Sequence, residues 1–448
     1  MSTLTLTIVI VFIFGYICIA LETLTKVNKA AVALLMLVVC WTLYMFDPAN
    51  FPAGITTDGI AAYAGGVIEG HLGSTATTLF FLMGAMTIVE TVDQNGGFNF
   101  VRDMLKTTSK KALLWRITIM TFFLSAILDN MTTAIVMVMI LRKLIDDRKD
   151  RLIYASLIII AANSGGAFSP IGDVTTIMLW NKSLISAAGV IKEMFIPSLV
   201  SIALPAYVLS FSLKGNVSQT ADLGTAVVAN DFTEGQRKAV FWIGVGGLIF
   251  VPIFKSITHL PPFVGILLVL GVLWLATEIF YRNAPEHSEE AGTQKRITNI
   301  ITRIDMGTIL FFLGILMAVS CLQEIGVLSV LGKGLNDVFD GNHYLITGII
   351  GVLSSIIDNV PLVAGCMGMY PLAEVGDMAQ DGIFWQLLAY CAGVGGSMLI
   401  IGSAAGVVVM GLEKITFIWY MKRISWIAFI GYIAGILVYW VEKSVIGL

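Results

Sequence analysis

The stretch Ser125–Val136, "SAILDNMTTAIV", places Asp129 and Asn130 side by side within a run, residues 112–145, that is otherwise almost wholly apolar. An ionised side chain deep in hydrocarbon costs at least about 2.5–3.5 kcal/mol on insertion scales, so such a residue usually faces a cavity or a partner. The pair is therefore a candidate functional site, provided that the run lies in a membrane.

The rest of the chain has the composition of a membrane protein. Of its 448 residues, 57% are hydrophobic and only 13% are charged. Apolar windows of about 20 residues, enough to cross the roughly 30 Å hydrocarbon layer as helix, recur from end to end. The pattern predicts an all-α polytopic membrane protein. We expect ten full crossings, at 3–21, 29–46, 74–92, 152–179, 194–213, 239–256, 262–281, 305–330, 384–412 and 424–441.

Two further apolar segments, 112–145 and 344–372, are predicted to be re-entrant hairpins that enter and leave on one side. Basic residues flank 112–145 at both ends, and each arm of about 16 residues spans only about 24 Å as helix. The alternative is two tight full crossings with the Asp-Asn pair in an outer turn. With both termini outside, the cytoplasmic loops hold most of the basic charge, as the positive-inside rule expects. The outer side has only Lys182, Lys192, Lys255, Lys333 and Lys443.

An internal repeat relates two halves of the chain. The string "LSAILDNMTTAIV" at 124–136 is echoed by "LSSIIDNVPLVAG" at 353–365, which carries a second pair, Asp358 and Asn359. A Gly-rich string follows each pair: "NSGGAFSPIGDVTTIM" begins at Asn163 and "GVGGSMLIIGSAAGVV" begins at Gly393. Glycine and proline in such runs predict a broken helix in each half.

We therefore predict two repeats, 1–213 and 239–448, joined by a cytoplasmic linker at 214–238. The broken helices are expected at 152–179 and 384–412. Five crossings are an odd number, so the second repeat is inverted relative to the first. Inverted repeats whose interrupted helices meet near the midplane are typical of secondary transporters.

The breaks and the hairpin tips supply many oxygen atoms. Helix breaks free backbone carbonyls, half-helix ends add dipoles, and hard cations prefer oxygen ligands. Structural roles are the alternatives: helix capping for either asparagine and for Asp173, and bonding back to the same helix for Ser169 and Thr176. The candidate cation- and proton-binding residues are Asp129, Asn130, Asp358 and Asn359 at the tips, with Asn163, Ser164, Ser169, Asp173, Thr175, Thr176, Ser397 and Ser403 near the breaks.

Three functions from different classes fit this pattern. The first is cation/proton exchange, because a buried carboxylate that holds either a proton or Na⁺ gives antiport when it is exposed alternately to the two sides of the membrane. For this function, Glu90 and Glu324 are possible proton relays; the alternative is that they lie in a water-filled vestibule. The second is a sodium-coupled anion or dicarboxylate carrier. The third is an intramembrane aspartyl protease, since two aspartates can form a catalytic dyad.

No basic arm suggests nucleic acid, and the five scattered cysteines predict neither disulfides nor a metal centre.

The strings "LDNMTTAIVM", "NSGGAFSPIGDVTTIMLW" and "SSIIDNVPLVAG" resemble those of NhaD-type sodium/proton antiporters in the ion-transporter superfamily, which also holds dicarboxylate and arsenite carriers. The resemblance covers both halves. It implies an exchanger of Na⁺ or Li⁺ for H⁺ in a bacterial-type inner membrane, without a cofactor and with membrane lipid as surroundings. It also implies a homodimer and a site built from both tips with Asn163, Ser164, Asp173, Thr175 and Thr176. Acids replace the tip serines of the carboxylate carriers, which disfavours an anionic substrate.

Overall fold

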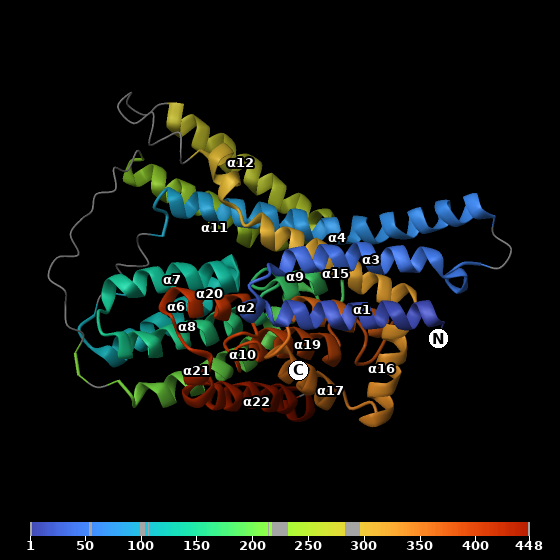
Figure 1. The fold of residues 1–448 in the computed structure, drawn as a ribbon. Helices are drawn as coiled ribbons and strands as arrows, with labels where there is room; N and C mark the ends of the chain where they lie inside the picture. Colours follow the sequence, from blue (N-terminus) through green and yellow to red (C-terminus); the bar gives the residue numbers. More distant parts are fainter. Residues whose placement is uncertain are drawn as a thin grey trace.

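The computed structural model describes residues 2–52, 56–98, 104–105, 107–213, 215–216, 232–282 and 296–446 (Figure 1). Within these ranges the chain forms helices, turns and bends, with a single isolated bridge between Ser109 and Asn216. Most of the predicted linker 214–238 lies outside the described residues. The described part of the chain is thus all-helical.

Eight of the described helices are long and apolar enough to cross a membrane, by length and composition. The chain is therefore a multi-pass membrane protein, as predicted. The first helix, α1 (Thr3–Ala20), is also apolar, and its stretch Thr3–Ile19 is one of the shorter apolar helices of the described chain. The eight are α3 (Lys29–Phe46), α4 (Thr57–Gln94), α6 (Lys110–Leu128), α10 (Ala187–Ser210), α11 (Glu234–Thr258), α12 (Pro262–Arg282), α15 (Met306–Glu324) and α22 (Ser425–Val441).

Several of the predicted crossings have different bounds in the structure, and at two of them the neighbouring segment differs as well. Helix α4 joins the short segment 59–71 to the crossing expected at 74–92, so its 38 residues extend about 57 Å. No proline interrupts it, and the Thr56 side chain caps its first turn. The crossing expected at 305–330 ends at Glu324, because Gly326 takes a left-handed φ of 74° and starts a separate helix, α16 (Val327–Val338).

Four pairs of consecutive helices are separated by short breaks. The first junction, at Asp129, separates α6 from α7 (Asn130–Leu144), and the second, ending at Asp358, separates α17 (His343–Ser354) from α18 (Asn359–Met369). The other breaks lie between α8 (Arg148–Ala167) and α9 (Val174–Asn181), and between α19 (Ile383–Gly395) and α20 (Ala404–Glu413). Short helices α2 (Glu22–Thr25), α14 (Ile297–Ile300) and α21 (Phe417–Arg423) complete the set.

Glycines let the helices beside these breaks approach closely. A Cβ on Gly165 of α8 would collide with the backbone oxygen of Phe122 on α6. At the equivalent place in the second half, a Cβ on Gly395 of α19 would collide with the backbone oxygen of Gly351 on α17. Each half therefore packs its broken helix directly on the backbone of the helix that precedes the junction.

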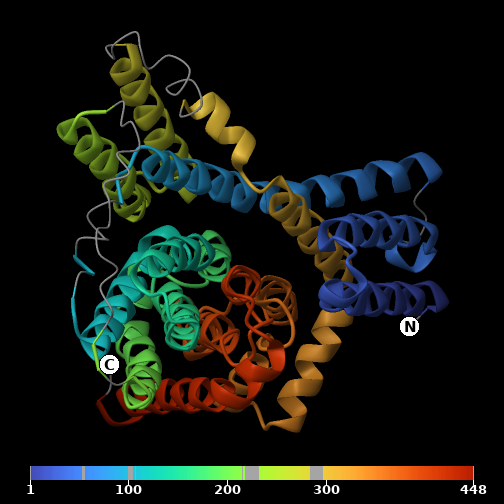
Figure 2. The same ribbon diagram turned by 60° about the vertical axis from the view of Figure 1, so that its left-hand side comes forward.

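The two halves of the chain pack together. The matching helices α8 and α19 contact each other, as do α10 and α22, and the contact of α7 with α20 has its counterpart in that of α18 with α9. In Figure 2 the green first half and the orange-to-red second half of this group lie side by side. We call α6–α10 and α17–α22 the core helices, and α1, α3, α4, α11, α12 and α15 the peripheral helices. The contact of α15 with α18 joins the two groups.

Candidate functional site

The residues that begin the second helix of each broken pair are caps. Asp129, Asp173, Asp358 and Ser403 are the N-cap residues of α7, α9, α18 and α20, and each side chain accepts a backbone N–H of the following turn. The capping interpretation of Asp173 is thus correct, whereas Asn130 and Asn359 follow the caps. Three of the four caps are carboxylates, which the positive ends of helix dipoles favour.

Asp173 is the meeting point of the two junctions. Its Oδ2 accepts a hydrogen bond of 2.8 Å from Asn130 Nδ2 at the first junction. Asn359 Nδ2 of the second junction donates to both carboxylate oxygens, at 3.3 Å to Oδ1 and 3.2 Å to Oδ2. All three side chains are buried, with Asp173 only 1% exposed. The two repeated Asp-Asn pairs therefore converge on one carboxylate.

Asn163 extends this cluster across the halves. Its Oδ1 accepts from Asn130 Nδ2 at 3.0 Å. Its Nδ2 donates to Ser397 Oγ and to Ser403 Oγ, both at 2.9 Å. Asn163 is fully buried, so its amide ties the break of α8 to the break of α19.

The junction carboxylates have separate partners. Asp129 accepts from the backbone N–H and the hydroxyl of Thr132, at 2.8 and 2.7 Å. Asp358 accepts from the Val360 backbone N–H and pairs with Lys29 Nζ at 3.3 Å. Both carboxylates nonetheless lie within electrostatic range of Asp173. The bonds to Asp173 therefore come from the junction asparagines, whereas the junction aspartates bond to other partners.

Backbone strain is found at the first junction. Asp129 has a φ of 97°, a region that residues with a Cβ rarely adopt. Such strain costs on the order of 1–3 kcal/mol and persists where the surrounding structure imposes it. The equivalent Asp358 has an ordinary φ of −51°, so the two junctions differ in backbone shape.

The remaining predicted residues divide between this cluster and other contacts. Thr175 Oγ1 donates to Asp173 Oδ1 at 3.0 Å, and Thr176 forms the capping box with Asp173. Ser164 accepts instead from Ser201 Oγ at 2.9 Å, and Ser169 donates to the Ala126 carbonyl. Glu90 accepts from Gln94 within α4, and Glu324 pairs with His71 at 2.7 Å. These last four make their described contacts outside the cluster.

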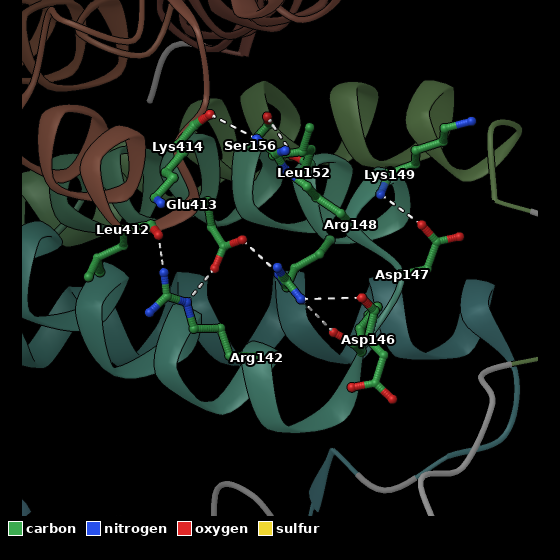
Figure 3. A network of polar contacts seen from close by, with 12 residues as sticks. Arg142, Asp146, Asp147, Arg148, Lys149, Leu152, Ser156, Leu412, Glu413 and Lys414 are labelled. Atoms are coloured by element: carbon green, nitrogen blue, oxygen red, sulfur yellow. Dashed lines mark hydrogen bonds and ion pairs between the residues drawn. The ribbon is translucent and has the colours of Figure 1, made fainter.

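Two sets of charged residues were missed by the sequence reasoning. Lys29, which no motif in the sequence singles out, is the partner of Asp358. Glu413 is 4% exposed and accepts from Arg142 Nε at 2.6 Å (Figure 3). It also accepts from Arg151 Nε at 2.7 Å. This second set joins α7 and α8 of the first half to the end of α20. No spacing in the sequence marks either set, because each joins residues more than 200 positions apart.

Comparison with known proteins gives consistent matches over most of the chain. The profile of a family described as "Citrate transporter" matches residues 16–386. "Sodium/proton antiporter 2" of Arabidopsis thaliana is 42% identical over 95% of this chain and 96% of its own length, and "Sodium/proton antiporter 1" of that plant is 44% identical over 95% and 70%. "Na(+)/H(+) antiporter NhaD" of Alkalimonas amylolytica is 31% identical over 81% of this chain and 77% of its own length.

Proposed function

The chain belongs to the citrate transporter family, among relatives named as sodium/proton antiporters, and from this premise we propose that it exchanges Na⁺ or Li⁺ for H⁺ across a membrane. The observation that supports this most directly is the convergence of both junctions on Asp173, with Asp129 and Asp358 nearby. The family and its named relatives are transporters, which sets aside the protease hypothesis.

Exchange follows from the cost of a buried negative charge. A bare carboxylate in a low-dielectric site is unfavourable, so it holds either a proton or a cation. At a site built from Asp129, Asp173 and Asp358, H⁺ and Na⁺ therefore compete, because binding of one ion excludes the other. Amide and hydroxyl oxygens from Asn163, Ser397 and neighbouring residues add ligands suited to a hard cation.

Alternating access in this proposal is a movement of the core helices relative to the peripheral helices. The two repeats are inverted, and the junctions are tips of re-entrant hairpins that enter from opposite faces. Because interrupted helices meet at the site, a small rearrangement exposes it to one side or the other. The working unit is a homodimer in a bacterial-type inner membrane, with both termini outside and lipid as its surroundings.

A sodium-coupled carboxylate carrier is the second candidate, and the description of the matched family favours it. The site argues against an anionic cargo, because Asp173 lies in it, Asp129 and Asp358 are within electrostatic range, and like charges repel. Uptake of labelled citrate or succinate into proteoliposomes that is driven by Na⁺ would favour this candidate over exchange.

Proton movement in inverted vesicles tests the proposal. A pH-sensitive dye reports proton release when Na⁺, Li⁺ or K⁺ is added, and we expect a response to Na⁺ and Li⁺ across a range of pH. The double substitution Asp129→Asn and Asp358→Asn should abolish the response, since neither junction then offers a carboxylate. Exchange that stays sodium- and pH-dependent in this double variant would refute the proposed site.

A further inference from the structure

The Asp358 carboxylate already has a cation beside it. Lys29 Nζ lies 3.3 Å from Asp358 Oδ2, and the two side chains are only 27% and 17% exposed. The residues are 329 positions apart in sequence. Lys29 begins the peripheral helix α3, whereas Asp358 caps the core helix α18. The pair therefore crosses the boundary between the two helix groups.

Lys29 is held in place by two further contacts. Its backbone N–H donates to Glu22 Oε1 at 3.1 Å, which positions the start of α3. Its ammonium lies 4.4 Å from the centroid of the Phe311 ring on α15, within the range of a cation–π interaction. The peripheral helices α3 and α15, together with Glu22 of the short helix α2, thus hold one positive charge beside the second junction.

A small cavity adjoins this pair. Its volume is about 60 Å³, room for a few waters or one partly hydrated small cation, and its lining includes Tyr16, Glu22, Lys29, Asp358 and Ser403. Ser403 also accepts from Asn163, whose amide belongs to the Asp173 cluster. The cavity thus extends from the Lys29–Asp358 pair to Ser403, which is hydrogen-bonded to Asn163 of the cluster.

We infer that Lys29 is a tethered counter-cation of Asp358, which the transported Na⁺ must displace before it binds. The inference rests on the proposed function. An ammonium and Na⁺ each neutralise one carboxylate, and the cavity holds little space for both. Lys29 then sets the apparent Na⁺ affinity, because only the fraction of molecules in which the pair is open is competent to bind. It acts as a positioning and specificity-determining residue without carrying the ion.

This arrangement also links occupancy to movement. Without Na⁺, the pair joins α3 to α18 and neutralises the second junction. When Na⁺ takes the carboxylate, the ammonium loses its partner, and one contact between the peripheral and core helices is released. Bound cation therefore favours the movement that carries it across, which suppresses movement of an empty site.

Two substitutions of Lys29 distinguish competition with Na⁺ for Asp358 from a purely structural role of the lysine. Lys29→Met removes the charge with little change in length, so the Na⁺ dissociation constant should fall about five- to tenfold if the pair is closed 80–90% of the time. Lys29→Arg keeps the charge and offers a bidentate fork to Asp358, so the constant should rise at least about twofold. A merely structural lysine would move both values in the same direction.

The experiment measures ²²Na⁺ binding to purified protein in detergent, together with Na⁺-driven proton movement in proteoliposomes. Lys26→Met is the matched control, because Lys26 is exposed three positions earlier, and its binding should stay within twofold of wild type. Phe311→Leu is a second variant that leaves Lys29 intact. It removes the cation–π contact that holds the ammonium beside Asp358, so the Na⁺ dissociation constant should fall about two- to threefold.

The outcomes separate this inference from the function on which it rests. A wild-type protein without Na⁺-dependent proton movement would overturn the proposed exchange. An active wild type whose Lys29→Met and Phe311→Leu variants bind Na⁺ with unchanged or weaker affinity would overturn only the role assigned to Lys29.

Discussion

Replacing Asp173 by Asn isolates the contribution of the charge at the meeting point of the junctions. Asparagine is as good an N-cap as aspartate, so α9 keeps its cap and the Thr175 backbone N–H keeps an acceptor. The second oxygen becomes an NH₂ group, which faces the NH₂ groups of Asn130 and Asn359. Donors then oppose donors where the wild-type protein has charge-assisted hydrogen bonds.

The magnitude follows from the number of bonds lost. Hydrogen bonds to a charged group contribute about 1.5–3 kcal/mol each. Loss of one from each asparagine, at the lower limit, weakens the docking of the two junctions by about 3 kcal/mol. Since 1.4 kcal/mol corresponds to tenfold, the population of correctly assembled sites falls by about two orders of magnitude. We expect the initial rate of Na⁺-driven proton movement to drop at least tenfold.

Asp147→Asn is the matched control for this measurement. Asp147 caps α8 through a 2.8 Å bond from the Lys149 backbone N–H, at an exposed position. The same substitution there also preserves the cap, so transport should stay within twofold of wild type. Dye-monitored proteoliposomes give the rate, and thermal unfolding in detergent reports assembly. If Asp173→Asn gave the same transport rate and the same midpoint of unfolding as Asp147→Asn, the hydrogen bonds of the two asparagines to the Asp173 carboxylate would not be needed for transport.

Three further substitutions test the packing around the site. Glu413→Gln leaves the two arginines without a charged partner. Because both arginines remain partly exposed, we expect the free energy of unfolding to fall by only about 2 kcal/mol, which a lower midpoint of thermal unfolding would show. Gly165→Ala should reduce the yield of folded protein on size-exclusion chromatography, since its Cβ meets the Phe122 backbone, whereas Gly73→Ala, in open space, should leave that yield unchanged or raised. Asn163→Ala should slow Na⁺-driven proton movement at least tenfold without loss of the folded monodisperse peak, and a wild-type rate would contradict its role in joining the halves.

Local patterns account for much of the fold. Apolar windows predicted the all-helical membrane character. Glycines in the run after each Asp-Asn pair, with Pro170 in the first run, lie where α8 and α19 end. Helix bounds were less predictable. The segment 59–71 continues into α4 and the crossing expected at 305–330 stops at Glu324, because helix length depends on packing as well as on hydropathy.

The candidate site was only partly predictable from its residues. The duplicated pairs mark Asp129 and Asp358, yet Asp173, which has serine at the equivalent position of the second half, is the residue on which both asparagines converge. Ser164 and Ser169 have the same oxygen chemistry as Ser403, but they bond elsewhere. Side-chain chemistry identifies possible ligands, and the direction in which each points depends on the turn that holds it.

By itself the sequence determined that the chain is a helical membrane protein with two acidic junctions, because hydrophobic length and repeated strings are local properties. Only the tertiary structure decided that Lys29 neutralises Asp358 and that two arginines enclose Glu413. These contacts join residues hundreds of positions apart, where no periodicity relates one partner to the other. A charge buried at low dielectric is stable only when it is paired, and the packing of the helices determines which residue lies beside it.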